Sequence, residues 1–158
     1  MVNGMVKVFV VYDTKHGNTK LVAEEIAEGI GEVGGIEIAI SDIEEVDLQK
    51  VADSEAILVG SPNHMGQPAR GIKKFIDKLG RIDLKAKWVA VFDTYLGGDF
   101  EKVVKKMEKR IGEKAPGLKL IASGLSIRVG AMKGPIVDGE LPKCKNFGRK
   151  IANQLKKA

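Results

Sequence analysis

Five short apolar segments alternate along the chain with segments whose apolar residues recur at helical spacing. The apolar segments are rich in β-branched and aromatic residues, and they lie at residues 6–12, 36–40, 56–60, 88–92 and 118–122. Strands that alternate with helices in this way form a parallel sheet covered by helices on both faces. The sequence therefore predicts an α/β three-layer sandwich around a five-stranded parallel sheet.

The length and composition are those of one soluble domain. Of the 158 residues, 44% are apolar and 30% are charged, so we predict a single domain over residues 1–158. No apolar run approaches the roughly 18 residues of a membrane span, and the N-terminus lacks the pattern of a secretory signal peptide. Because Cys144 is the only cysteine, we expect no disulfide, no cysteine-built metal site and a cytoplasmic location.

The charge balance allows two interpretations. Lys and Arg number 26 against 21 Asp and Glu, which gives a formal net charge of +5. This excess is either a Lys-rich solvated surface or a basic face for an acidic partner or nucleic acid. Only five of the cations are Arg, and none sits in an Arg–aromatic cluster of the kind that grips bases, so nucleic acid is not expected as a partner.

Ligands of open parallel sheets bind beyond the carboxyl ends of the strands, which directs attention to the loops after strands one, three and four. The first loop, residues 13–19, opens directly onto a helix, where backbone N–H groups can bind a phosphate. Gly17 allows close approach of the backbone, and Thr14, Asn18 and Thr19 supply hydrogen-bond donors. Thr19 could instead serve only as a helix cap.

Other phosphate-binding signatures are missing from these loops. There is no G-x-G-x-x-G for a dinucleotide and no G-x-x-x-x-G-K-[ST] for a nucleoside triphosphate. No Cys followed by Arg is present to act as a phosphatase nucleophile. Gly60 and Ser61 stand at the end of strand three, where a phosphoacceptor receiver domain would carry an Asp.

The first loop resembles the phosphate loop of the flavodoxin family, [Ser/Thr]-x-[Ser/Thr]-Gly-x-[Ser/Thr], placed between the first strand and the first helix. Thr14, Gly17 and Thr19 match this pattern, whereas His16 replaces the middle hydroxyl residue. The resemblance covers almost the whole chain and extends to the flavodoxin domain of diiron oxygen reductases. It implies the strand order 2-1-3-4-5 and bound FMN, with the phosphate held by Thr14, Lys15, His16, Gly17, Asn18 and Thr19.

No insertion is expected to interrupt strand five, so the short-chain type of flavodoxin fits better. In this family the loops after strands three and four hold the flavin ring between them, and here they are residues 60–68 and 93–99. Both loops are rich in Gly. The resemblance implies that the ring is bound by Pro62, Asn63, His64, Met65, Gly66, Asp93, Thr94, Tyr95, Leu96, Gly97 and Gly98.

Three side chains of these loops suit the two faces of the ring. By the resemblance, Tyr95 stacks on one face, and His64 or Met65 covers the other. The Met65–Gly66 peptide would turn over when the flavin is reduced. Each side chain also has a structural interpretation, because Met65 could be a hydrophobic plug, His64 an exposed loop residue and Tyr95 a residue packed on strand four.

The rim of this site differs in charge from that of many flavodoxins, which are strongly acidic around the flavin. Asp93 and Asp99 are the only carboxylates in the two ring loops. Because negative charge near the flavin lowers its potential, a less acidic rim predicts a less extreme potential and a different partner surface.

We therefore predict an FMN-dependent electron carrier that shuttles electrons between redox partner proteins, as a monomer or a weak homo-oligomer. His16 and His64 are the only histidines, and no catalytic acid–base pair and no metal site are expected. Whether the chain is also an enzyme stays open. One alternative is an NAD(P)H-dependent quinone or small-molecule reductase of the same fold, which residues 60–75 also resemble. Another is a flavin-free interaction module.

Overall fold

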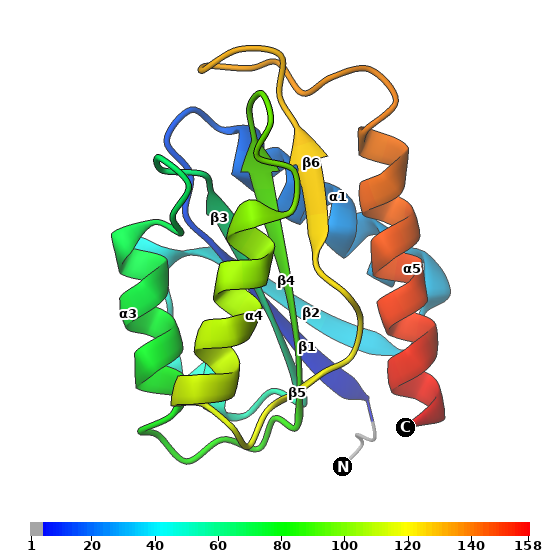
Figure 1. Ribbon diagram of the computed structural model, residues 1–158. Helices are drawn as coiled ribbons and strands as arrows, with labels where there is room; N and C mark the ends of the chain where they lie inside the picture. Colours follow the sequence, from blue (N-terminus) through cyan, green and yellow to red (C-terminus); the bar gives the residue numbers. More distant parts are fainter. Residues whose placement is uncertain (1–4) are drawn as a thin grey trace.

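The computed structural model describes residues 5–158. The prediction that the N-terminus carries no signal peptide therefore falls partly outside the described residues. Within it, a parallel sheet runs through the middle of the molecule (Figure 1). The strands are β1 (Val6–Tyr12), β2 (Ile36–Asp42), β3 (Ala56–Pro62), β4 (Trp88–Tyr95), β5 (Lys119–Leu120) and β6 (Leu125–Arg128). Their order is β2-β1-β3-β4-β5, and β6 pairs with β4 farther along the same edge. The predicted strand order 2-1-3-4-5 is confirmed.

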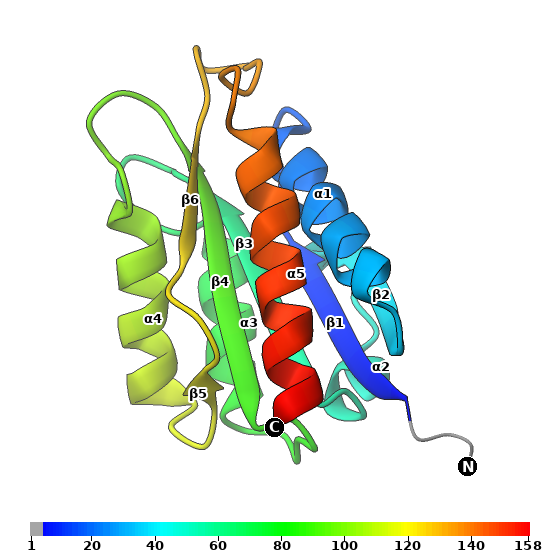
Figure 2. The same cartoon turned by 90° about the vertical axis from the view of Figure 1, so that its right-hand side faces the viewer.

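Helices cover both faces of the sheet (Figure 2). One face is covered by α1 (Asn18–Val33) and α5 (Leu141–Lys157), and the other by α3 (Arg70–Leu79) and α4 (Lys102–Lys114). A 3-10 turn, η1 (Ile43–Glu45), and a short helix, α2 (Leu48–Ala52), connect β2 to β3. These layers confirm the predicted three-layer α/β sandwich.

The central strands β1, β3 and β4 are apolar on both faces because each face packs against helices. Successive side chains of a strand point to opposite sides. In β1, Val8 and Val10 belong to the core beneath α1 and α5, whereas Phe9 and Val11 belong to the core beneath α3 and α4. This double burial explains why the strands are continuous apolar runs rather than alternating ones.

The fifth position of the sheet differs from the prediction. Strand five was expected without interruption at residues 118–122, but two short strands stand there, and residues 121–124 separate β5 from β6. A Cβ on Gly124 would lie 2.7 Å from the Val104 Cβ, so the chain passes close to α4 at this point. The apolar run at 118–122 predicts a strand there. The strand β6 that follows is not predicted, because it contains the polar residues Ser126 and Arg128.

All strands point the same way, so their carboxyl ends meet at one edge of the sheet. That edge lies at the top of Figure 1 and carries the loops after β1, β3, β4 and β6. The helices α1, α3 and α4 begin at the same edge. Several strand ends and helix N-termini therefore lie along one edge of the molecule.

Candidate functional site

A cavity of about 540 Å³ opens at the carboxyl edge of the sheet. This volume lies within the range of about 300–1,000 Å³ that is usual for small-molecule sites. Four loops contribute to it, and its lining residues are Thr14, Lys15, His16, Asn18, Thr19, Pro62, Asn63, His64, Met65, Thr94, Tyr95, Leu96, Asp99, Val129 and Met132. Twelve of the seventeen residues expected from the sequence to hold the cofactor are among them.

The other five expected residues are placed differently. Within the described part of the chain, the cavity lining does not include Gly17, Gly66, Asp93, Gly97 or Gly98. Gly17, Gly66 and Gly97 have positive φ angles that turn their loops, and Asp93 is buried.

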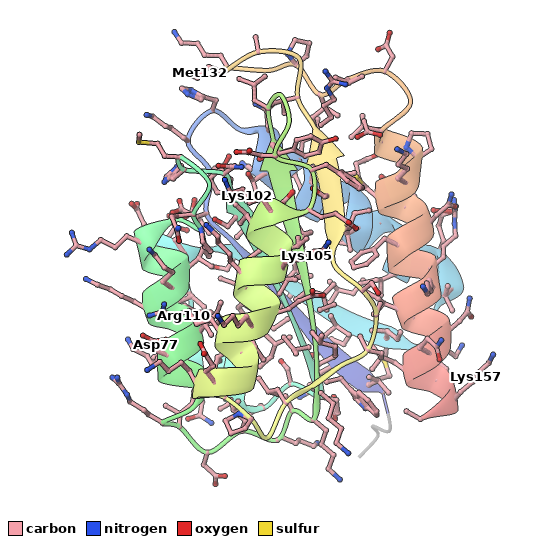
Figure 3. The ribbon with its side chains drawn as sticks, viewed as in Figure 1. Asp77, Lys102, Lys105, Arg110, Met132 and Lys157 are labelled. Atoms are coloured by element: carbon pink, nitrogen blue, oxygen red, sulfur yellow. The ribbon has the colours of Figure 1, made fainter. Side chains whose placement is uncertain are left out.

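Sequence reasoning did not assign Val129 and Met132 to the site. Both lie in the loop after β6, at the tip of which Met132 projects (Figure 3). The rule that ligands bind beyond the carboxyl ends of the strands applies to this loop too. It could have found these residues if the fifth strand had been placed correctly. Asp99 also lines the cavity, and sequence reasoning noted it only as a loop carboxylate.

The first loop presents a free helix N-terminus to the cavity. Gly17 has a φ of 90° and precedes α1, and its N–H donates to the Thr14 Oγ1 at 2.9 Å. Among the described residues, no side chain caps the first N–H groups of this 16-residue helix. Thr19 is therefore not a cap: it is buried, and its Oγ1 lies 3.0 Å from the Thr94 Oγ1 on β4.

The ring slot lies between the loops after β3 and β4. The Tyr95 ring is mostly buried and packs edge-to-face on Phe100, with ring centroids 5.6 Å apart. Burial raises the pKa of the Tyr95 hydroxyl above its ordinary value of 10.0. Opposite it, His64 is exposed and Met65 is completely exposed, at 101% of its reference area. Met65 is thus not a plug in the hydrophobic core.

A tight two-residue turn carries Met65 and Gly66. His64 and Gln67 exchange both backbone hydrogen bonds, at 2.9 and 3.0 Å. The central residues have φ values of 55° and 81°, and a turn with two positive φ angles suits the twist of the flanking backbone. Positive φ is uncommon for a side chain such as that of Met65 and costs roughly 1–3 kcal/mol, so the surroundings must hold the turn.

Three hydrogen bonds hold this turn from outside. The Gly66 N–H donates to the Asn63 Oδ1 at 2.6 Å, and the Lys106 ammonium donates to the Gly66 carbonyl at 2.7 Å. The Asn63 amide in turn donates to the Asp99 Oδ2 at 2.9 Å. The turn is therefore tied both to α4 and to the loop after β4.

Asp93 joins three elements behind the cavity. Its Oδ1 accepts a hydrogen bond from the Ser126 Oγ at 2.6 Å, and its Oδ2 accepts one from the Val104 N–H in the first turn of α4 at 3.0 Å. The Ser126 hydroxyl also accepts the Glu101 N–H at 2.9 Å. Burial raises the pKa of Asp93 to about 6, although these hydrogen bonds oppose the shift.

Among the described residues, no group of three or more His, Cys, Asp or Glu side chains is arranged to hold a metal ion. Within residues 5–158, no helix combines the length and the apolar composition that crossing a bilayer requires.

Comparison with known proteins identifies the family. A family model described as a flavodoxin domain matches residues 9–129. The chain belongs to the flavodoxin domain family. Among its relatives, the flavodoxin of Aquifex aeolicus (strain VF5) is 30% identical over 159 residues, which cover 94% of this chain and 86% of that protein. The flavodoxin of Clostridium saccharobutylicum is 27% identical and covers 95% of this chain and 98% of its own length.

Solved structures agree with this assignment. A flavodoxin from the domain Archaea superimposes with a TM-score of 0.81 at 29% identity, covering 96% of this chain and 99% of that one. The flavodiiron core of Flv1 from Synechocystis sp. PCC6803 superimposes with a TM-score of 0.78 at 19% identity. It covers 98% of this chain but 37% of that chain, and it shows the shared fold alone.

Membership of this family confirms the predicted function and cofactor. Flavodoxins bind FMN and transfer electrons through it, and they work with redox partner proteins. The chain is thus an FMN-binding electron-transfer flavodoxin, and neither the reductase nor the flavin-free alternative is favoured.

The cavity residues fit this cofactor. The free N–H groups at the start of α1 suit its phosphate, and the slot beside Tyr95 suits its ring.

Proposed function

We propose that residues 1–158 form a single flavodoxin-like domain that carries electrons between redox proteins, with FMN bound in the cavity at the carboxyl edge of the sheet. One observation carries this proposal: a single cavity contains both a helix N-terminus and a slot with apolar walls. Among the described residues, no side chain caps that helix N-terminus. FMN has an anionic end and a flat aromatic end, so it would use both. When bound, FMN supplies the redox chemistry by accepting and giving up electrons.

The phosphate end of the site is the loop between β1 and α1. Backbone N–H groups at the start of α1 and the positive end of the helix dipole would hold the phosphate. Thr14 and Thr19 would add hydroxyl donors and Asn18 an amide, while Lys15 and His16 are exposed at the rim and would add positive charge or backbone N–H groups.

The ring end of the site is the slot between the loops after β3 and β4. Tyr95 would stack on one face of the ring, because it is already held in place by Phe100. His64 or Met65, both exposed, would cover the other face and exclude water from it. Pro62, Asn63, Thr94 and Leu96 complete the walls, and they all line the cavity.

The turn at Met65–Gly66 is the part of this site that could respond to reduction. If the Met65–Gly66 peptide turns over, the Gly66 N–H must leave the Asn63 Oδ1, to which it donates at 2.6 Å. The bond from Lys106 goes to the Gly66 carbonyl, which belongs to the next peptide, so it can persist. The hydrogen bond to Asn63 would therefore oppose the rotation of the Met65–Gly66 peptide, whereas the hydrogen bond from Lys106 would hold the Gly66 carbonyl in place during it.

We also place the protein in the cytoplasm, as a monomer or a weak homo-oligomer. The one thiol of the chain, Cys144, is buried, so it offers no site for a disulfide between subunits. Size-exclusion chromatography with light scattering would measure the oligomeric state, and a stable tetramer would contradict this part of the proposal.

Ligand titrations test the two ends of the site separately. Riboflavin lacks the phosphate of FMN, so Thr19→Ala should weaken FMN binding about five-fold, through a lost hydrogen bond worth about 1 kcal/mol, and leave riboflavin binding unchanged. Tyr95→Ala should weaken both ligands, because it acts on the ring. Tyr95→Phe keeps the stacking ring and serves as the matched control.

The wild-type titration comes first, because it decides whether the proposal stands at all. A purified protein with a flavin absorbance spectrum, or an apoprotein that takes up one FMN per chain, would support the cavity as the site. If no saturable uptake occurs, the proposed function is wrong. If the wild type binds FMN but neither Ala variant changes the affinity, FMN binds elsewhere.

A further inference from the structure

The helices α3 and α4 carry a large share of the positive charge of this protein. They lie side by side on one face of the sheet (Figures 1 and 3). Together they hold ten Lys and Arg residues against three Asp and Glu residues. Their formal charge of +7 exceeds the +5 of the whole chain, so the remaining residues sum to a negative charge. We call the solvent side of α3 and α4 the basic face.

Most cations of the basic face are not neutralised by carboxylates. Asp77 pairs with Arg110 across the two helices, with an N–O distance of 2.7 Å (Figure 3), and Glu101 lies 3.7 Å from Lys105. In the part of the chain that the structure describes, no ion pair involves Arg70, Lys73, Lys74, Lys78, Lys109 or Lys114. Their charge is available to an approaching molecule.

The helix pair on the opposite face of the sheet is less basic. There, α1 and α5 carry a combined formal charge of +3, because the four Glu residues of α1 offset the cations of α5. Two ion pairs join these helices, Lys145 with Glu28 at 3.0 Å and Arg149 with Glu32 at 2.9 Å. The excess of positive charge is therefore larger on the helix pair α3 and α4 than on the helix pair α1 and α5.

The basic face begins at the rim of the cavity. At the start of α4, the Lys102 ammonium lies 4.0 Å from the carboxylate of Asp99, which lines the cavity. One turn later, Lys106 donates to the Gly66 carbonyl. Helix α3 starts at Arg70, immediately after the loop that contains Gly66. A molecule that touches the cavity mouth therefore comes close to the first cations of α4, and α3 follows the same loop in the chain.

Exposed apolar side chains surround the same cavity mouth. Met65, Leu96 and Met132 all line the cavity, and all three are exposed. Phe100 is also exposed and packs on Tyr95. Such a group of exposed apolar residues is unusual on a protein surface and marks a contact site. We call Met65, Leu96, Phe100 and Met132 the apolar rim.

The geometry points to the apolar rim and the basic face as one docking surface for a small acidic electron-transfer protein. This inference rests on the proposed function, and it adds the charge of the partner and the side from which it approaches. The apolar rim would bring the two redox centres close together. The cations of α3 and α4 would steer a negatively charged partner and raise its association rate about 10- to 1,000-fold at low salt.

Two other anionic partners fit the surface less well. Nucleic-acid sites rely on Arg and on aromatic side chains that stack on bases, whereas the basic face is mostly Lys. A membrane-surface helix inserts an apolar face, but the apolar residues of α3 and α4 are buried against the sheet. An acidic protein needs neither feature.

The test is electron transfer from the FMN-loaded protein, reduced beforehand, to two cytochromes of opposite charge. Soluble acidic cytochrome b5 and basic cytochrome c serve as the probes, and each haem takes up one electron as the flavin loses one. Rates are measured by stopped flow from about 0.01 M to about 1 M NaCl, over which the Debye length falls from about 30 Å to about 3 Å. We expect the cytochrome b5 rate to fall at least ten-fold over this range and the cytochrome c rate not to fall.

Matched charge reversals locate the effect. In one variant Arg70, Lys74 and Lys109 on the basic face become Glu, and in the control Lys87, Lys150 and Lys157, which are exposed elsewhere, become Glu. Both variants change the net charge by the same amount. At low salt, the basic-face variant should reduce cytochrome b5 at least ten-fold more slowly than the wild type does. At high salt the two rates should converge. The control variant should keep most of the low-salt rate of the wild type.

A binding measurement that does not depend on electron transfer completes the test. Amide NMR shifts induced by cytochrome b5 should fall on α3, α4 and the turn at residues 64–67. Equal losses in the two variants, or shifts centred on α1 and α5, would overturn the inference. Tighter binding to duplex DNA or to anionic vesicles than to cytochrome b5 would also overturn it. If FMN binds and is reduced normally in these experiments, the proposed function survives.

Discussion

Asp93 should couple the stability of this protein to pH more strongly than any exposed carboxyl group can. Its side chain is completely buried, and burial raises its pKa to about 6 from an ordinary value of 3.8. In the unfolded chain the ordinary value should return. The folded protein therefore binds this proton more tightly than the unfolded chain does, so protonation of Asp93 stabilises the fold.

The size of the effect follows from the pKa difference. A shift of about 2 pKa units corresponds to about 3 kcal/mol of unfolding free energy. This stabilisation is complete below about pH 3.8 and is lost as the pH rises through about 6, with a slope of at most about 1.4 kcal/mol per pH unit. Other carboxyls act in the opposite direction: the hydrogen bond from Arg110 lowers the pKa of Asp77. The total pH dependence therefore does not isolate Asp93.

The variant Asp93→Asn isolates it, because an amide has nearly the same shape and cannot ionise. Its oxygen can accept from the Val104 N–H, and its NH₂ can donate to the Ser126 hydroxyl. The measurement is urea unfolding followed by circular dichroism from about pH 4 to about pH 7, with both proteins in the same excess of FMN so that ligand stabilisation cancels. Because this range begins slightly above the ordinary pKa of 3.8, the stability of the wild type relative to the variant should fall by about 2 kcal/mol, which is most of the full effect.

The control for the change in net charge is the same substitution at Asp83, whose side chain is exposed. If the stability curves of the wild type and Asp93→Asn run parallel across this range, the carboxyl does not exchange a proton there. The reasoning from burial would then be refuted, and the hydrogen bonds from Ser126 and Val104 would outweigh the loss of water.

Three further predictions concern other sites. Asn63→Ala removes the acceptor that holds the Gly66 N–H. If that hydrogen bond breaks on reduction, its loss, worth about 1 kcal/mol, should raise the first one-electron reduction potential of the flavin by about 40 mV. Spectroelectrochemistry measures this potential, and an unchanged value would exclude the role of Asn63. Gly60→Ala places a methyl group against the Phe92 ring and should destabilise the protein by about 1–3 kcal/mol in urea unfolding, whereas a neutral effect would mean that the ring can move. Burial raises the pKa of the Cys144 thiol to about 12, so a thiol reagent at pH 8 should label it only as fast as the protein unfolds.

The architecture could be predicted because burial on both faces makes each central strand an apolar run. The same pattern failed at the strand ends. The runs predicted at 56–60 and 88–92 extend in the structure to Pro62 and Tyr95. Ser61 pairs in register with Asp93, and such polar residues look like loop in a sequence. Long-range pairing, which a local pattern does not contain, makes them strand.

The site could be predicted only as far as single loops allow. Each loop carries its own signal, such as the glycine at position 17 before a helix. The contacts that join Asn63, Asp99 and Lys106 depend on which loops become neighbours, and the local sequence does not encode that. Val129 and Met132 were missed for a related reason, because the misplaced fifth strand moved their loop away from the predicted site.

The parallel sheet explains why cofactor binding and partner docking share one end of the molecule. Parallel strands need helices that return and begin again at the carboxyl edge, so the edge that forms the cavity also carries the N-termini of α3 and α4. Complexes of electron carriers are small and short-lived, and charge then contributes more to their rate of formation than to their affinity. Cations such as Lys74 and Lys109 lie on the helices that flank the cavity without touching it. Substitutions can therefore change the charge of these helices to suit a different partner without altering the phosphate loop or the ring slot.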